Sequence, residues 1–158
     1  MFREIRRIRQ KMTEEECIEV LKNETRGVLS VAGLEGYPYG MPMNHWYDEE
    51  TGKLWFHGGK FGHKIDAIRE NPKVSYCVFD KGFLKEGDWA LNVHSVIIFG
   101  TAELIDDPQM ICDISRKLCY KFTNDESYIT KEMEQSAKNT LMICVTIDHM
   151  SGKLVNEK

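Results

Sequence analysis

The sequence predicts an α+β domain in which roughly six strands, paired mostly as antiparallel hairpins, close into a small barrel with helices between them. Three observations support this prediction. Segments rich in β-branched and aromatic residues recur between turn residues, four other segments place apolar residues at helical spacing, and no internal repeat or low-complexity linker interrupts them. With 158 residues the chain is long enough to enclose its own core, so we expect residues 1–158 to form a single domain.

The N-terminal half is predicted to contain one helix followed by two hairpins. Thr13 is followed three residues later by Glu16, which is the pattern of a capping box, so the helix is predicted to begin near residue 13. Residues 25–33 are predicted to form a strand. Residues 34–58 are predicted to form a strand, a turn and a second strand, with "DEETG" as the hairpin connection.

The second half alternates helices and strands. "KIDAIRENP" predicts a short helix that begins at Lys64 and ends at Asn71-Pro72. "KVSYCVFD" predicts a strand, and the polar "KGFLKEGDW" that follows it predicts a loop. The remaining predicted elements are a long strand over 92–105 with a bulge or bend at Gly100, a helix begun by Asp107 and Pro108, a helical pattern over 125–139 and a last strand over 140–153.

The charge distribution argues against nucleic acid as a partner. Residues 1–12 form a basic arm in which "FREIRRIRQK" carries five of the 21 basic residues, but the whole chain has a net charge of −4. Such a mildly acidic domain would repel a polyanion beyond the arm. The alternative for the arm is a solvated helical face whose Ile5 and Ile8 pack on the body or on a partner.

Membrane insertion and metal binding are also not expected. No window reaches the ~18 to 20 apolar residues needed to cross a bilayer, and the start lacks a signal-peptide core, so we expect a cytoplasmic protein. The five cysteines are odd in number and form no CxxC pair, which argues against a disulfide framework and structural zinc. His57 and His63 have no Cys, Asp or Glu nearby in a ligand spacing, so no metal site is predicted.

The segment "FHGGKFGHK", residues 56–64, is the strongest local indication of a ligand. A strand that ends in glycines and opens a helix leaves unpaired backbone N–H groups at the positive end of the helix dipole. Lys64 falls in the first helical turn, where a cation is unfavourable unless an anion lies beside it. The segment therefore predicts a phosphate site, and the alternative is a loop in which the glycines only make the turn.

A resemblance that covers nearly the entire chain extends this hypothesis. "GYPYGMPMNHWYDEETGKLWFHGGKFGHKIDAIRENPKVSYCV", then "SVIIFGTAELIDD" and finally "IDHMSGK" resemble the pyridoxamine 5′-phosphate oxidase-like, FMN-binding split-barrel superfamily, and within it the nitroimidazole-resistance (Nim-type) family. The resemblance implies a six-stranded, mostly antiparallel split β-barrel with flanking helices. It also implies a homodimer with FMN in two equivalent clefts between the subunits.

The resemblance assigns cofactor contacts to three parts of the chain. One strand would lie along the flavin ring, a strand end and the following turn would hold the ribityl chain and phosphate, and a later strand would reach the cofactor from elsewhere. The implied cofactor-binding residues are Pro42, Met43, Asn44, His45, His57, Gly58, Gly62, His63, Lys64, Ser95 and Val96.

The resemblance implies an FMN-dependent oxidoreductase, which we expect to be an NAD(P)H-linked reductase of small nitroaromatic or quinone-like acceptors. A non-enzymatic flavin or haem carrier or sensor is the alternative, and deazaflavin in place of FMN stays open. Relatives that oxidise pyridoxamine phosphate carry a C-terminal extension containing Arg and His. This chain ends in "HMSGKLVNEK", so that reaction is not expected.

His57 and His45 are the candidate catalytic residues, because imidazole titrates near neutrality and a reduced nitro group must take up protons. The alternative for each is a hydrogen-bonded structural histidine. His149 is expected to meet either the cleft or the partner subunit. The candidate walls for a flat ligand, which could equally serve core or interface packing, are Trp46, Trp89 and Phe61.

Overall fold

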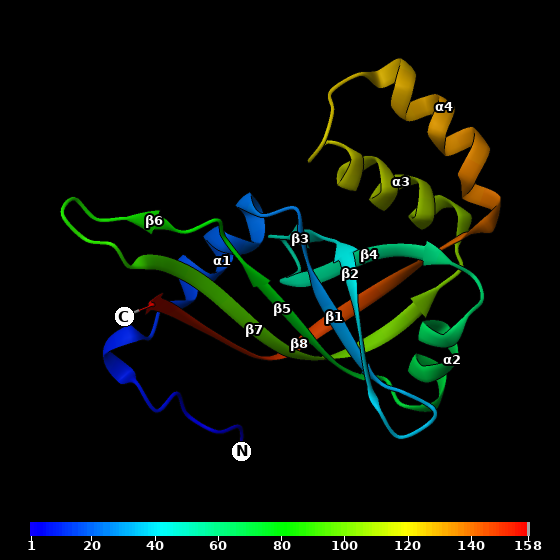
Figure 1. Ribbon diagram of the computed structural model, residues 1–158. Helices are drawn as coiled ribbons and strands as arrows, with labels where there is room; N and C mark the ends of the chain where they lie inside the picture. The colour runs from blue at the N-terminus through cyan, green and yellow to red at the C-terminus, as the bar shows by residue number, and fades with distance from the viewer. Residues whose placement is uncertain (158) are drawn as a thin grey trace.

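The computed structural model describes residues 1–157 and shows one antiparallel sheet with helices at its edges and ends (Figure 1). The strands are hydrogen-bonded in the order β2-β1-β5-β7-β8-β4-β3, with the short β6 paired to β7. Their bounds are β1 Arg26–Ala32, β2 Pro38–Asn44, β3 Trp46–Asp48, β4 Lys53–Gly59, β5 Lys73–Phe79, β6 Phe83–Leu84, β7 Leu91–Ile105 and β8 Thr140–Asn156.

The sheet curls because its two outermost strands are consecutive in the chain. β2 and β3 stand at opposite ends of the strand order, yet only His45 separates Asn44 from Trp46. The first and last strands must therefore meet, which rolls the sheet into a split barrel. The predicted α+β class and barrel are consistent with this arrangement.

The count of strands differs from the expected six, because the structure has eight. The strand expected before the "DEETG" turn is divided at His45, whose backbone N–H donates to the carbonyl of Thr25 at 3.3 Å. β2 pairs with β1 up to that point, and β3 pairs with β4 beyond it. The other addition is β6, a two-residue pairing with β7 inside the segment predicted to be a loop.

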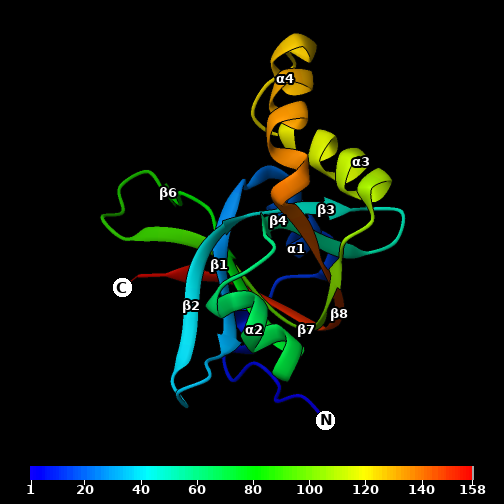
Figure 2. The ribbon, with the colours of Figure 1, turned by 90° about the vertical axis from the view of Figure 1, so that its right-hand side faces the viewer.

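The helices lie where the sequence patterns predict them, although α2 begins at His63, one residue before the expected start, and α4 ends at Ser136. Their bounds are α1 Glu14–Asn23, α2 His63–Glu70, α3 Pro108–Cys119 and α4 Glu126–Ser136, with short 3-10 turns at Ile8–Gln10 and Ala137–Asn139. α2 and the α3–α4 pair lie at the same end of the sheet, at the right in Figure 1, and α4 stands away from the barrel in Figure 2. None of the helices within residues 1–157 has the length and apolar character needed to span a bilayer.

The predicted capping box of α1 is confirmed. The Thr13 hydroxyl accepts from the Glu16 backbone N–H at 3.2 Å, and the Glu16 carboxylate accepts from the Thr13 N–H at 2.7 Å. Replacing Thr13 with alanine should lower the free energy of unfolding by about 1 kcal/mol, because the backbone N–H of Glu16 loses its side-chain acceptor. Urea denaturation measures this, and Thr130→Ala on the exposed face of α4 is the control that should cause no loss.

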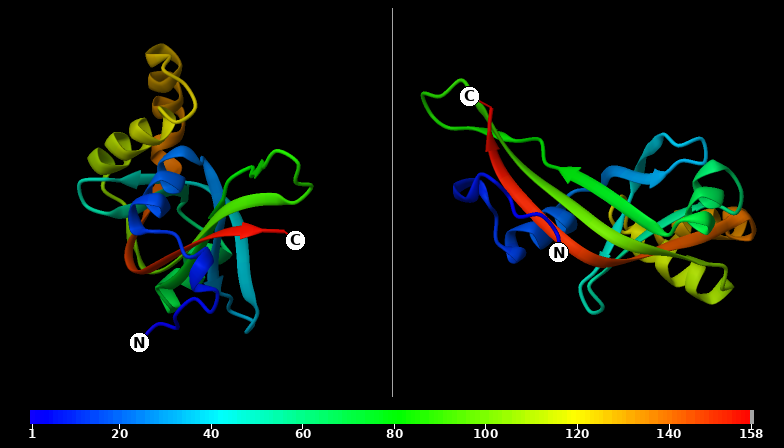
Figure 3. Two further views of the ribbon diagram at one scale, coloured as in Figure 1. Left: turned by 90° about the vertical axis from the view of Figure 1, so that its left-hand side faces the viewer. Right: turned by 90° about the horizontal axis from the view of Figure 1, so that it is seen from below.

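β7 and β8 are the longest strands and run side by side across the molecule, as the view from below in Figure 3 shows. Phe99 pairs with His149 and Gly100 pairs with Ile147, so Asp148 is an extra residue on β8. The predicted irregularity at Gly100 is confirmed, with the bulged residue on the neighbouring strand. A Cβ at Gly100 would lie 2.5 Å from Val145 Cγ1, so no larger residue fits without a shift.

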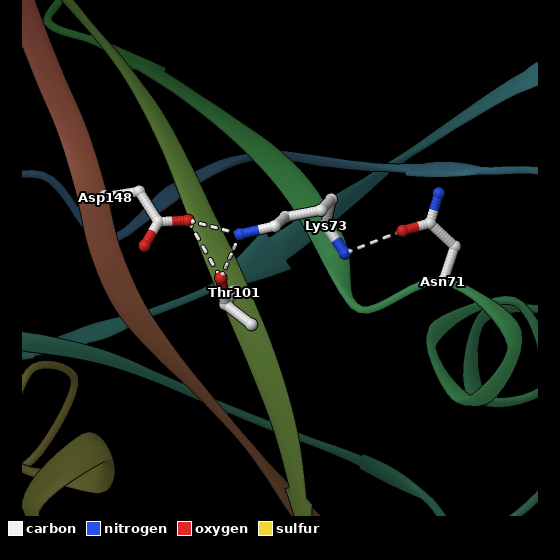
Figure 4. A network of polar contacts seen from close by, with 4 residues as sticks. All are labelled: Asn71, Lys73, Thr101 and Asp148. Atoms are coloured by element: carbon white, nitrogen blue, oxygen red, sulfur yellow. Dashed lines mark hydrogen bonds and ion pairs between the residues drawn. The ribbon is translucent and has the colours of Figure 1, made fainter. Parts of the chain in front are cut away.

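Hydrogen bonds to Asp148 connect β5, β7 and β8 at this bulge (Figure 4). Lys73 Nζ on β5 donates to Thr101 Oγ1 at 2.7 Å and to Asp148 Oδ2 at 3.0 Å, and the Thr101 hydroxyl donates to the same oxygen at 2.8 Å. The Thr101 hydrogen bond and the Lys73 ammonium lower the pKa of Asp148. The network fixes the register of β5, β7 and β8 where the ladder is irregular.

The core fills the inside of the curled sheet and the space under α1 and α2. Its largest fully buried side chains include Tyr76, Phe56 and Leu21. A second apolar cluster lies between the sheet and α3, with Ile111, Ile114 and Met142 among its members. Ile111 and Ile114 of α3 therefore contribute to the core, whereas Met110 of the same helix is exposed.

Candidate cofactor-binding site

The turn between β4 and α2 has the backbone geometry that the sequence predicted. Gly62 is the N-cap residue of α2, with φ of 119°, a conformation that favours glycine. Its carbonyl accepts from the N–H groups of Ile65 and Asp66 at 2.9 and 3.1 Å. The N–H groups of His63 and Lys64 belong to the first turn and have no intrahelical acceptor, so they remain available to a ligand.

Lys64 reaches back over the end of β4 toward β2. Its Nζ lies 3.5 Å from the Met43 thioether sulfur, a weak acceptor. A Cβ at Gly58 would lie 3.1 Å from that Nζ, so the glycine leaves the room in which the ammonium sits. Burial lowers the pKa of Lys64. No ion pair to Lys64 is found among residues 1–157.

A cavity of about 310 Å³ lies beside this lysine, and its lining residues are Arg26, Pro42, Met43, Asn44 and His57. The Arg26 Nε donates to Asn44 Oδ1 at 2.8 Å. Burial and the neighbouring Lys64 charge lower the pKa of His57, which favours the neutral form of its imidazole. The lining contains one permanent cation, Arg26, and hydrogen-bond donors but no carboxylate.

These residues fit a phosphate group. Lys64 is a half-buried cation that has only a thioether as its hydrogen-bond partner among residues 1–157, and an anion would offset the cost of its burial. The outward N–H groups at the start of α2 add the positive end of the helix dipole. Arg26, which the sequence did not single out, contributes a second cation because β1 pairs it directly with Asn44.

His45 lies inside the core and away from any cavity. Its side chain is completely buried, with Nε2 2.7 Å from the Leu21 carbonyl and Nδ1 2.7 Å from the Tyr76 hydroxyl. With the N–H on Nε2, Leu21 accepts from it and the Tyr76 O–H donates to Nδ1, so both ring nitrogens are used. Burial and the nearby Lys121 charge lower the pKa of His45 to about 4. This geometry is that of a hydrogen-bonded structural histidine, so we propose His57 and not the His45 side chain as the proton donor.

His63 faces the β1–β2 hairpin. Its ring centroid is 4.5 Å from that of Tyr39, and Nε2 is 3.6 Å from the Glu35 carboxylate. Nε2 itself is buried and makes no hydrogen bond within the described residues. His63 and Lys64 therefore extend from the helix start in different directions, and only Lys64 contacts Met43.

The structure does not bring Ser95 and Val96 to this site within one chain. Val96 is fully buried and Ser95 pairs with Phe79 and Lys153 on the neighbouring strands. His57 pairs with Met142, whose other partner is Ile105 at the far end of β7. Ten residues separate Ser95 from Ile105, which is about 33 Å along a strand.

The aromatic candidates occupy three different environments. Trp46 is partly buried against the cluster below α3, with Lys117 Nζ 4.7 Å from its ring centroid. Trp89 and Phe61 are largely exposed. His149 stacks on Phe2 of the N-terminal arm at a centroid distance of 4.7 Å, so the arm covers part of the sheet's outer face.

Comparisons with known proteins identify the family and the fold of the chain. Residues 13–154 match the family profile described as pyridoxamine 5′-phosphate oxidase. No curated protein sequence matches the chain. Within residues 1–157 no group of three or more His, Cys, Asp or Glu side chains is placed to hold a metal ion.

Three solved structures share the fold. A candidate 5-nitroimidazole antibiotic resistance protein from Bacteroides thetaiotaomicron is 21% identical with a TM-score of 0.77, over 92% of this chain and 87% of that one. A FAD-binding protein from Mesorhizobium loti is 23% identical with a TM-score of 0.66, over 92% and 97%. The flavocytochrome Anf3 from Azotobacter vinelandii is 20% identical with a TM-score of 0.75, over 96% and 72%. Since the profile match spans most of the sequence, the chain belongs to the pyridoxamine 5′-phosphate oxidase family.

Proposed function

We propose that this protein is an FMN-dependent oxidoreductase that uses NAD(P)H to reduce small nitroaromatic or quinone-like acceptors. The observation that carries the proposal is Lys64, a half-buried ammonium without an anionic partner at the start of α2. An FMN phosphate beside it would bear about two negative charges at pH 7. The Bacteroides protein described as a resistance protein and the FAD-binding Mesorhizobium protein share this fold, which supports a flavin and a nitro acceptor.

The residues around the cavity would bind different parts of the cofactor and the acceptor. Lys64, Arg26 and the first N–H groups of α2 would hold the phosphate, and β2 from Pro42 to Asn44 would lie along the ring. The flavin, when bound, supplies the two-electron chemistry. His57 would take up a proton from solvent at one ring nitrogen and pass the proton of the other nitrogen to the acceptor or its product, and would so return to its neutral form.

The overall reaction balances with NAD(P)H as the reductant. Reduction of a nitro group to a nitroso group takes two electrons and two protons and releases water. NAD(P)H supplies a hydride, and solvent supplies the other proton. Donor and acceptor would use the same cleft in turn, which predicts ping-pong kinetics.

We further propose a homodimer with the cofactor between the subunits. The outer face of β1, β5 and β7 exposes apolar side chains in adjacent registers, among them Val28, Phe79, Ile97 and Phe99. A sheet face of this kind is buried most simply against an identical copy. Ser95 and Val96 lie on or under that face, so they would contact the cofactor held by the second subunit.

Sedimentation of the protein with FMN tests the cofactor and the dimer together. We expect flavin absorbance to move with a species of twice the 18.4 kDa chain mass, at one FMN for each chain. Flavin that sediments as the free molecule would overturn the cofactor proposal. Flavin on an 18.4 kDa species would overturn the shared cleft.

Steady-state turnover separates the enzyme from the alternative of a flavin or haem carrier or sensor. That alternative is favoured by the likeness to a flavocytochrome. Saturable oxidation of NAD(P)H in the presence of a nitroimidazole or a quinone is expected for the enzyme. Tight FMN binding without turnover would support the carrier.

A further inference from the structure

A second cavity opens next to the proposed FMN site, between the sheet and the α3–α4 pair. Its volume is about 270 Å³, and it shares Asn44 and His57 with the first cavity. These two residues therefore form a common wall between the two spaces. Figures 1 and 2 show that α3 and α4 lie over the end of the sheet where β4 ends and β8 begins.

The second cavity is mostly apolar with an aromatic rim. Leu118 and Met133 are buried and form its floor. Phe122 and Tyr128 line it with about half of each side chain exposed, which leaves their rings accessible to a flat ligand. Pockets for drug-sized ligands usually measure about 300–1,000 Å³, so this one suits a single ring with small substituents.

The charge in the second cavity is opposite to that in the first. Glu132 on α4 is the only charged side chain among its lining residues. Burial raises the pKa of the Cys119 thiol on α3, and the negative charge of Glu132 raises it further. The Glu132 carboxylate therefore acts on another residue that lines the cavity. No ion pair to Glu132 is found among residues 1–157. A hydroxyl, an N–H or a cationic group on a ligand would strengthen its binding in this cavity, and a carboxylate would weaken it.

We propose that the cavity between α3 and α4 is the acceptor-binding pocket, and that it selects neutral or cationic one-ring compounds with a hydrogen-bond donor directed at Glu132. This inference rests on the proposed function, since it places the acceptor beside the cofactor across the shared wall of Asn44 and His57. His57 then lies between the two ligands, where its N–H can reach the acceptor. The sequence did not indicate this pocket, because its residues come from β2, β4, β8, two helices and the segment that joins the helices.

Binding of metronidazole, a neutral nitroimidazole with a hydroxyl group, tests the pocket without turnover. Calorimetric titration of the FMN-loaded protein in the absence of NAD(P)H gives the affinity, and equilibrium dialysis gives FMN occupancy. Ser115→Phe fills the cavity from α3 and should weaken metronidazole binding roughly tenfold while FMN still binds. Tyr128→Ala, at the exposed rim, should weaken metronidazole binding several-fold. This second variant keeps the test valid even if Ser115→Phe does not fold.

Selectivity tests the role of Glu132. The wild-type protein should bind 4-nitrobenzyl alcohol at least about fivefold more tightly than 4-nitrobenzoate, and Glu132→Gln should remove most of that preference. Glu134→Gln, an exposed change on the same helix outside the cavity, is the matched control and should preserve it.

The results distinguish this inference from the proposed function. Unchanged metronidazole affinity in Tyr128→Ala and in a folded, FMN-loaded Ser115→Phe would overturn the pocket while leaving the cofactor proposal intact. An unchanged preference in Glu132→Gln would overturn the charge selection. Failure of the wild-type protein to bind FMN would overturn the proposed function itself.

Discussion

Replacing Lys64 with alanine should weaken FMN binding roughly 10- to 150-fold. A charge-assisted hydrogen bond to phosphate contributes about 1.5–3 kcal/mol, and Lys64 has no other anionic partner among residues 1–157 to share that energy. Fluorescence titration of FMN at fixed salt gives the dissociation constants. Unchanged FMN affinity in the variant would show that the phosphate does not lie beside Lys64.

Two controls make this result specific to the phosphate. Riboflavin has the same ring without the phosphate, so Lys64→Ala should leave its affinity nearly unchanged. Lys60→Ala removes a lysine four residues earlier whose Nζ already pairs with Asp106 at 2.6 Å, so it should change FMN binding little. An equal loss for riboflavin and FMN would point to a disturbed fold rather than a lost phosphate contact.

The same lysine should behave differently in the protein without FMN. Burial of an ammonium beside a thioether is unfavourable, because water is replaced by a weak acceptor. Lys64→Met should therefore leave the melting temperature of the FMN-free protein unchanged or raise it. A clear decrease would mean that Lys64 contributes to folding, which would remove the main reason to assign it to a ligand.

The stability of the protein should fall steeply between pH 6.5 and pH 4 because of His45. Its folded-state pKa is about 4, against an ordinary value of 6.5. In this range the unfolded chain takes up a proton that the folded protein excludes, so the free energy of unfolding decreases as the pH falls. For this one group the loss approaches about 3 kcal/mol at pH 4.

Comparison of His45→Gln with the wild-type protein isolates this contribution from that of the carboxylates. The variant should be less stable than the wild type at pH 7, because glutamine does not reproduce both hydrogen bonds of the imidazole. Since glutamine does not titrate, the free energy of unfolding of the variant should decrease less on acidification. Urea denaturation from pH 7.5 to pH 4 would show the two curves converging. Phe56→Leu, a change at a fully buried residue beside Tyr76, should instead lower stability by the same amount at every pH. Parallel curves for His45→Gln would contradict the assignment.

His45 also shows where sequence reasoning reached its limit. The local pattern placed it within one strand, which the structure divides at this residue, and a histidine in a strand can face a ligand or the core. The choice depends on Leu21 from α1 and Tyr76 from β5, which hold its two nitrogens. Neither residue is near it in the sequence, so no local pattern could have identified the pair.

By contrast, local patterns were sufficient to predict the backbone structure of the turn at residues 59–64. Its glycines, its helix start and the unfavourable position of Lys64 are all local properties, and the structure reproduces them. The role assigned to this turn stays a prediction until FMN binding is measured. Arg26 was missed because its approach to Asn44 depends on the hairpin register, which the sequence does not specify.

The sequence by itself determined the order and ends of the helices, the long β7 and β8 strands, and the positions of Gly62 and Gly100, because caps, turns and periodicity act over a few residues. Only the tertiary structure decided that the sheet rolls up at His45, that Asp148 is the bulged residue, and that Asn44 and His57 separate two cavities. Each of these features depends on contacts between segments that are far apart in the chain. Packing and hydrogen bonding between those segments form only in the folded structure, so local sequence patterns do not specify them.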